Sequence, residues 1–238
     1  MPLDYQNVFV PITHDLMGGY YVTPQERPRG AIVLIQEIFG VTPAMRSIAD
    51  DYAEAGYAVL VPDIYWRLER DLSLGNGEDP VQRDAAVDYS QRYDEETGIG
   101  DLVAAAKWLE NKLAITPAVL GFCLGGRMAV RLAAATQLSA MVSMYGVGLD
   151  KHRSEILDIA CPVQLHFGDN DNHNPRDVID SIENHVSDRG VADDEFFIYP
   201  GAEHAFYNRY RSDRFNDGAH RQARERVLQF LAKCAERR

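Results

Sequence analysis

The sequence predicts an α/β protein with a mainly parallel central sheet and helices on both of its faces. Short, continuous apolar runs recur along the 238 residues, as is typical of strands buried on both sides. Segments with helical spacing of apolar residues separate these runs, and strands joined through helices pair in parallel. Around Cys123, an apolar run ends in a Gly-x-Cys-x-Gly turn that leads directly into an Ala-rich helical segment. Together these observations indicate strands and helices that alternate along the chain.

Eight short runs predict the strands. The first two are short and lie within a polar, turn-rich stretch, which is typical of a leading hairpin. The others are largely apolar, as expected for buried strands. In chain order, the expected strands are residues 8–12, 19–22, 30–37, 57–62, 117–122, 139–145, 162–167 and 195–200.

Helical segments lie between the buried runs. Thr42 as an N-cap and Pro43 in the first turn begin the first helix, and Gly56 follows its end. Residues 63–79 are irregular and too long for a simple connection, so we interpret them as a surface lid or a pocket wall. The expected helices are residues 42–55, 80–93, 99–113, 124–136, 175–188 and 217–235.

Composition and charge narrow the classes of function. The net charge of −12 argues against nucleic acid and anionic membrane surfaces as partners. Three widely separated cysteines suggest neither disulfides nor a metal cluster, and we expect no metal and no cofactor. We see no signal peptide, and no apolar run approaches the ~20 residues of a membrane span. We therefore expect a cytoplasmic single domain over residues 1–238, a monomer or weak homo-oligomer that acts on a small molecule.

The turn at Cys123 matches a nucleophile elbow with cysteine in the place of serine. Such a turn crowds the backbone, and Gly121 and Gly125 would relieve that crowding. The helix that starts at Leu124 directs its N-terminus at the sulfur, which favours a thiolate and can hold a developing oxyanion. The alternative is a buried cysteine in a glycine-rich turn. Cys161 and Cys234 have no such turn, and we interpret both as structural.

A thiol nucleophile needs a base, and the base needs an orienting group. His204 follows the last strand and precedes the final helix, which is the position that a base requires in this strand order. His166 lies within an apolar strand and is interpreted as a core residue. Asp169 and Asp171 both follow the strand at residues 162–167, and spacing alone does not separate them. The remaining histidines lie in polar contexts and are expected at the surface: His14, His152, His173, His185 and His220.

Glu37 is a further candidate because it ends the strand at residues 30–37. Ligands of parallel sheets bind beyond the carboxyl ends of the strands. Position alone leaves two interpretations, a carboxylate of the site or a solvated strand end.

Five stretches of the sequence resemble the dienelactone hydrolase (carboxymethylenebutenolidase) family of α/β-hydrolases. They occur in the family's order and span most of the chain. The matching stretches are Gln36-Glu37-Ile38-Phe39-Gly40-Val41, Gly121-Phe122-Cys123-Leu124-Gly125-Gly126, Tyr145-Gly146-Val147-Gly148-Leu149, Phe167-Gly168-x-x-Asp171-x-x-x-Pro175 and Gly201-Ala202-x-His204-x-Phe206.

The resemblance implies an α/β-hydrolase fold and a Cys-His-Asp triad that cleaves a carboxylic ester or lactone through an acyl-enzyme. It implies that Cys123 attacks the carbonyl and that His204 is the base, and it selects Asp171 as the orienting acid. It also implies that Glu37 lies near the resting thiol and is displaced when substrate binds. A nearby anion opposes a second negative charge, so the thiol of the free enzyme would be less reactive.

The resemblance further implies residues that contact the substrate. The oxyanion donors are the backbone N–H groups of Ile38 and Leu124, and Phe39 and Tyr145 belong to the substrate-binding set. Members that cleave dienelactones bind the substrate carboxylate with two arginines, and Arg83 matches the first.

The sequence departs from the family at the second arginine. That position, four residues after His204, is Asn208, and Arg209 comes one residue later as a candidate replacement. Aromatic pocket residues of the family are also absent from the segment of Arg83, where Val87 and Ser90 align and Tyr89 is a neighbour.

These observations predict an ester or lactone hydrolase, with a dienelactone-like enol lactone as the family substrate. One alternative is a broader carboxylesterase or thioesterase with a reshaped pocket. Another is a non-catalytic relative that binds a small molecule or senses redox state through Cys123.

Overall fold

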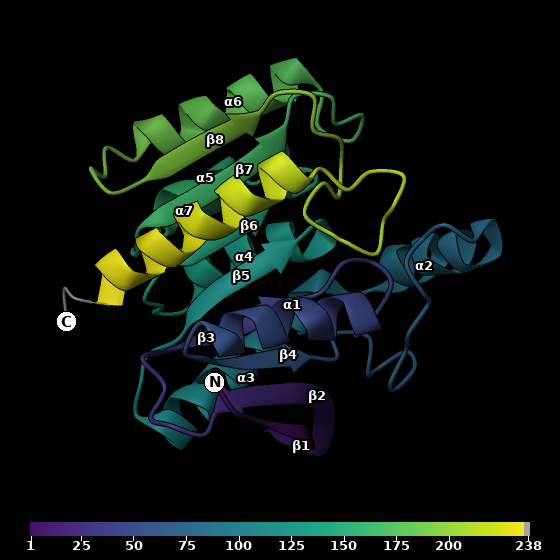
Figure 1. Ribbon diagram of the computed structural model, residues 1–238, viewed down its shortest axis with the longest axis vertical. Helices are drawn as coiled ribbons and strands as arrows, with labels where there is room; N and C mark the ends of the chain where they lie inside the picture. Colours follow the sequence, from purple (N-terminus) through teal and green to yellow (C-terminus); the bar gives the residue numbers. More distant parts are fainter. Residues whose placement is uncertain (236–238) are drawn as a thin grey trace. The chain divides into compact units, whose positions relative to one another are not determined.

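The computed structural model describes residues 1–235, which fall into two compact units: the first comprises residues 1–118 and the second begins at residue 119 (Figure 1). A single domain over residues 1–238 stays a prediction. No helix among residues 1–235 is long and apolar enough to cross a lipid bilayer.

The first unit contains four strands in the order β1-β2-β4-β3. β1 (Leu3–Ile12) and β2 (Asp15–Pro24) form the predicted leading hairpin, with longer strands than the sequence indicates. β2 pairs antiparallel with β4 (Tyr57–Pro62), and β4 pairs parallel with β3 (Gly30–Ile35). Every residue of β3 and β4 is buried, as their apolar composition predicts.

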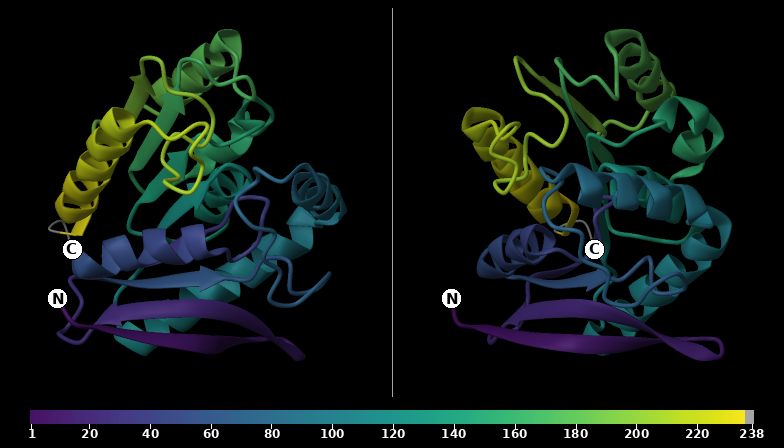
Figure 2. Two further views of the ribbon diagram at one scale, coloured as in Figure 1. Left: turned by 45° about the vertical axis from the view of Figure 1, so that its right-hand side comes forward. Right: turned by 90° about the vertical axis from the view of Figure 1, so that its right-hand side faces the viewer.

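Three helices accompany these strands, and two of them cover opposite faces of the sheet. α1 (Pro43–Glu54) lies on one face and α3 (Glu95–Leu113) on the other (Figure 2). The Thr42 hydroxyl caps α1 as predicted, by accepting a hydrogen bond from the N–H of Met45 at 3.3 Å. α3 begins four residues before the predicted start because the Asp94 carboxylate caps it. α2 (Pro80–Arg92) is capped by Asp79.

Residues 63–79 contain no helix or paired strand beyond a single bridge between Ser73 and Gly40. Buried Tyr65, Trp66 and Leu72 anchor the segment. Gly40 has a φ of 90°, and a Cβ atom there would lie 1.9 Å from the carbonyl oxygen of Leu72, so this contact requires glycine.

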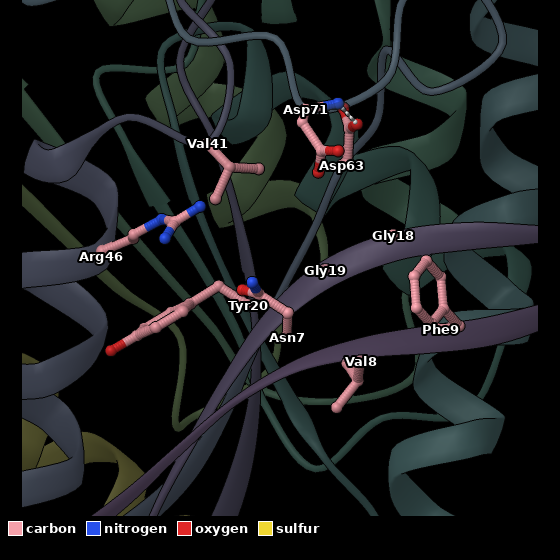
Figure 3. A pocket seen from close by; sticks show the side chains of 10 residues that line it. All are labelled: Asn7, Val8, Phe9, Gly18, Gly19, Tyr20, Val41, Arg46, Asp63 and Asp71. Atoms are coloured by element: carbon pink, nitrogen blue, oxygen red, sulfur yellow. Dashed lines mark hydrogen bonds between the residues drawn. The ribbon is translucent and has the colours of Figure 1, made fainter.

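The irregular segment also forms part of a pocket wall, one of the two roles that the sequence predicts for it. Asp63 and Asp71 lie side by side on one side of a cavity of about 110 Å³, and Arg46 lies on another side (Figure 3). The N–H of Asp71 donates to Asp63 Oδ2 at 2.8 Å. The remaining wall comes from the hairpin and from Val41.

The second unit contains four parallel strands in the order β5-β6-β7-β8. Their bounds are Ala118–Phe122, Met141–Met144, Val163–Gly168 and Glu195–Tyr199. These four match predicted runs to within two residues at each end, so the predicted parallel pairing is confirmed here.

Helices cover both faces of this second group of strands. α7 (Asp217–Ala235) lies on one face, and α4 (Leu124–Ala135) and α6 (Arg176–Asp188) lie on the other (Figures 1 and 2). Two short helices, η1 (Leu149–Lys151) and α5 (Arg153–Asp158), are not predicted by the sequence. A helix of one or two turns is too short to show a helical period in the sequence.

Candidate active site

Cys123 occupies a strained backbone position between β5 and α4. Its φ is 56° and its ψ is −116°, a conformation that is rare for residues other than glycine. The turn leaves no room for a side chain at Gly121, because a Cβ atom there would lie 1.9 Å from the carbonyl oxygen of Gly125. The predicted strand–turn–helix is therefore present. It holds a partly exposed cysteine at the N-terminus of a helix.

The other two cysteines, which the sequence indicates are structural, are buried. Burial raises the pKa of the Cys161 thiol to about 12, so this group stays a thiol at neutral pH. A thiol reagent should therefore distinguish Cys123 from Cys161 and Cys234.

His204 lies beside Asp171. The Nδ1 atom of His204 donates a hydrogen bond to Asp171 Oδ2 at 2.8 Å, and both side chains are buried. Asp169 serves a different purpose, because its Oδ1 accepts from the N–H of Gly201 at 2.6 Å. Of the two acids that spacing left open, Asp171 is thus the one that the loop after β7 places against His204.

Neighbouring groups hold Asp171 in its charged form. Its Oδ1 accepts from the N–H of His173 at 2.8 Å, and its Oδ2 also accepts from Asn174 Nδ2 at 2.9 Å. Burial alone would raise the pKa of Asp171. The hydrogen bonds and the charge of His204 outweigh burial and hold this pKa below its ordinary value. The sequence predicts His173 only as a surface residue and gives Asn174 no role, and their nearness to Asp171 in the chain is the one available signal.

The pKa of His204 depends strongly on its neighbours. Burial by itself would lower its pKa, but the charge of Cys123 and the hydrogen bond with Asp171 outweigh burial and raise it. The Nε2 atom is buried and makes no hydrogen bond of ordinary geometry within residues 1–235. Nε2 is therefore the atom of His204 that is available to a further partner.

Aromatic rings pack against His204. Tyr145 is buried with a φ of 40°, and its ring meets the imidazole edge-on at a centroid distance of 5.0 Å. Phe206 packs edge-on against Tyr145 at 5.4 Å. The His173 ring lies 4.5 Å from the His204 ring. Tyr145 is thus a direct neighbour of the candidate base.

Arg209 is exposed and is directed at α7. Its Nη2 donates to His220 Nε2 at 3.0 Å, and His220 Nδ1 donates to the carbonyl oxygen of Tyr207 at 2.9 Å. Asn208 is buried, and its Oδ1 accepts from the N–H of Tyr210 at 3.0 Å. The guanidinium of Arg209 therefore already has a partner within the second unit.

Two predictions of surface placement are wrong. His220 and His185 are only 3% and 8% exposed, because the faces of α7 and α6 that carry them are turned toward the protein. His166 is a core residue, as predicted. Its Nε2 bonds to Gln164 and its Nδ1 to the Tyr199 hydroxyl, and burial lowers its pKa to about 3.

Of three predicted site residues in the first unit, two are buried and one is exposed. Glu37 is buried directly beyond β3, and Phe39 is buried two residues later. Arg83 is exposed on α2, where its Nε and Nη2 donate to the carbonyl oxygens of Gly77 and Glu78 at 3.0 and 3.3 Å. Arg83 therefore ties α2 to the turn that precedes it.

The described residues offer no obvious metal centre, since residues 1–235 contain no group of three or more His, Cys, Asp or Glu side chains placed to hold a metal ion. A strained cysteine between a strand and a helix, followed along the chain by an acid and a histidine after later strands, is the arrangement of α/β-hydrolases.

Comparison with known proteins identifies the family within that class. A model of the dienelactone hydrolase family matches residues 17–235, and the chain belongs to this family. It is 31% identical over 219 residues to carboxymethylenebutenolidase 1 of Cupriavidus pinatubonensis, covering 90% of this chain and 91% of the relative. It is 32% identical over 217 residues to a carboxymethylenebutenolidase of Pseudomonas putida, covering 90% of each.

A solved structure confirms the fold. The putative dienelactone hydrolase of Klebsiella pneumoniae aligns with 98% of this chain and 99% of its own, with a TM-score of 0.85 and 24% sequence identity. The protein is therefore an α/β-hydrolase of the carboxylic ester hydrolase type, which acts on an ester or a lactone.

Proposed function

We propose that the protein hydrolyses its substrate through Cys123 as nucleophile, His204 as base and Asp171 as the group that orients the base. The observation that carries this proposal is the buried hydrogen bond between His204 Nδ1 and Asp171, which leaves Nε2 for the thiol. The strained turn at Cys123 supports it, because such turns present a nucleophile at the start of a helix.

The reaction begins with transfer of the Cys123 proton to His204 Nε2 and attack of the sulfur on the ester carbonyl. The carbonyl oxygen becomes an oxyanion, and the N–H of Leu124 at the start of α4 is a donor without an acceptor within the helix. Collapse of this intermediate breaks the carbon–oxygen bond, and the leaving oxygen takes the proton from His204. A thioester on Cys123 remains.

Water then completes the reaction. His204 accepts a proton from a water molecule as its oxygen attacks the thioester carbon. The carbon–sulfur bond breaks, the carboxylic acid leaves, and the proton on His204 returns to the sulfur. Asp171 stays ionised throughout and stabilises the imidazolium each time it forms.

The family resemblance supplies the other proposed roles. Ile38 would provide a second oxyanion donor, and Glu37 would restrain the resting thiol. Phe39 and Tyr145 would contact the substrate, and Arg83 would bind a substrate carboxylate. The names of the curated relatives make a dienelactone the first substrate to propose.

A second candidate is a broader esterase or thioesterase. Asn208 stands where the second arginine is expected, and Arg209 donates to His220. Arg83 donates to two loop carbonyls. Both arginines thus already donate hydrogen bonds to the protein. These contacts favour a substrate that does not need a carboxylate in order to bind. A redox-sensing role for Cys123 would instead give reversible loss of thiol titre under mild peroxide without any hydrolysis.

Steady-state hydrolysis of a dienelactone and of a neutral activated ester tests the proposal, with the wild type, Cys123→Ala and the matched control Cys161→Ala. We expect Cys123→Ala to abolish nearly all hydrolysis and the control to retain it. Efficient lactone cleavage supports the dienelactone assignment, whereas cleavage of the neutral ester alone supports the broader esterase. Hydrolysis that persists in Cys123→Ala would overturn the proposed nucleophile.

A further inference from the structure

His173 contacts both the acid and the base of the proposed triad. Its backbone N–H donates to Asp171 Oδ1 at 2.8 Å. Its ring lies against the ring of His204 at a centroid distance of 4.5 Å and an interplanar angle of 57°. One residue therefore restrains the carboxylate through its backbone and the imidazole through its side chain.

The two rings differ in their exposure to solvent. His173 is exposed, whereas His204 is only 6% exposed. The His173 side chain thus covers part of a ring that would otherwise meet water. Its position on the loop after β7 is fixed by the turn at Asp171, because the N–H of Asn174 also donates to the carbonyl oxygen of Asp171 at 3.1 Å.

We propose that His173 is a positioning residue of the reaction, which holds the His204 imidazole in place through ring packing and shields it from water. The inference rests on the proposed triad. It assigns His173 no proton transfer. It requires that an aromatic ring occupy this position and that the ring be uncharged while His204 carries a proton.

The charges that face His173 favour its neutral form. Although His173 is exposed overall, partial burial of its ring against its neighbours and the charge of His204 lower the pKa of His173, while Asp171 opposes this change. Arg214 and Arg211 contribute in the same direction as His204, and both of them pair with Asp213. At neutral pH the ring is therefore uncharged, whereas at acidic pH a proton on His173 would repel a protonated His204.

Two substitutions separate packing from charge. His173→Phe keeps an aromatic ring but cannot be protonated, whereas His173→Ala removes the ring. His14→Ala, at an exposed histidine of the β1–β2 turn, is the matched control. We expect kcat to fall about tenfold in His173→Ala with little change in KM, since small displacements of a catalytic group are costly. We expect His173→Phe to restore most of kcat.

The pH profile of kcat/KM distinguishes positioning from a purely structural role. On the acidic side, the wild type should lose activity at a higher pH than His173→Phe, because only the wild type gains the repulsive charge. Imidazole NMR provides a readout that needs no substrate. The pKa of His173 should rise in His204→Gln, because coupling between titrating groups is reciprocal.

The outcomes also separate this inference from the proposed triad. Wild-type kcat in His173→Ala, or identical acidic limbs in the wild type and His173→Phe, would overturn the role of His173 while the triad stands. Hydrolysis that does not depend on Cys123 would overturn the triad. In that case, an unchanged pKa of His173 in His204→Gln would refute the coupling of the rings as well.

Discussion

His204 Nδ1 and Asp171 Oδ2 lie 2.8 Å apart, although 33 residues separate them in the chain. Asp171 follows β7 and His204 follows β8, and these strands pair in parallel. Because parallel strands end at the same edge, the two loops meet there. The parallel pairing of β7 and β8 therefore brings the two loops together, and the conformation of the loop after β7 directs Asp171 at His204.

The first prediction concerns the acid. Asp171→Asn should lower kcat by about 10²–10⁴-fold, because an amide in this place can stabilise the wrong tautomer of His204 and cannot stabilise the imidazolium. Asp169→Asn is the matched control, since its remaining amide oxygen can still accept from Gly201. Steady-state kinetics on an activated ester measures both. Equal losses in the two variants would contradict the role of Asp171.

The sequence predicts this site well where a single backbone constraint defines it. The elbow at Cys123 is visible because the contact between residues 121 and 125 excludes a side chain, which leaves glycine as a signature in the sequence. The sequence also shows that the acid and the histidine follow later strands, because these strands can be recognised from their apolar runs.

Contacts that depend on loop and helix packing are not visible in the same way. Sequence spacing does not show whether Asp169 or Asp171 lies beside His204. Only the conformation of the loop directs Asp171 at His204. The sequence predicts His220 at the surface, yet it is buried because it lies on the inward-facing side of α7. The ring of His173 is exposed as predicted, but its contact with His204 requires the three-dimensional arrangement of two loops.

The second prediction concerns Glu37. If its carboxylate restrains the resting thiol, Glu37→Gln should speed alkylation of Cys123 by iodoacetamide near neutral pH, because a nearby anion opposes a thiolate. Mass spectrometry would assign the modified cysteine. Glu54→Gln, at an exposed position of α1, controls for the lost charge. A rate–pH profile like that of the wild type would refute the role of Glu37.

The third prediction concerns Arg83. Arg83→Ala should raise KM about tenfold for an anionic ester and leave KM for a neutral ester nearly unchanged, if the guanidinium binds a carboxylate. Arg92→Ala on the same helix is the control, because Arg92 pairs only with Asp88 among the ion pairs described for it. Since Arg83 also bonds to Gly77 and Glu78, an equal effect on both esters would indicate a structural role.

The fourth prediction concerns the elbow backbone. Gly121→Ala should destabilise the protein by at least about 3 kcal/mol, because the new Cβ would collide with the backbone at Gly125. Gly100→Ala is the opposite case, since Gly100 is exposed on α3 and a Cβ there meets nothing within 4 Å. It should stabilise by about 0.5–1 kcal/mol. Urea unfolding would measure both, and similar effects at the two sites would contradict the argument.

The fifth prediction concerns Asp63, which lines the pocket in the first unit. Burial raises its pKa to about 6, and the charge of Asp71 acts in the same direction, against hydrogen bonds from the N–H groups of Asp71 and Tyr65. A carboxyl group whose pKa is raised on folding binds protons more tightly in the folded state. Its contribution to stability is therefore fully present below about pH 4 and is lost as the pH rises through about 6.

Asp63→Asn removes this pH dependence. The two-unit shift corresponds to about 3 kcal/mol, while the amide leaves one of the two N–H donors without its acceptor, at a cost of about 1–3 kcal/mol. The variant should therefore be clearly less stable than the wild type at pH 4.5 and approach it at pH 7.5. Urea unfolding at both pH values measures the difference, with the exposed Asp84→Asn on α2 as the charge control. A stability difference that stays constant between these pH values would show that Asp63 is ionised in the folded protein throughout this range.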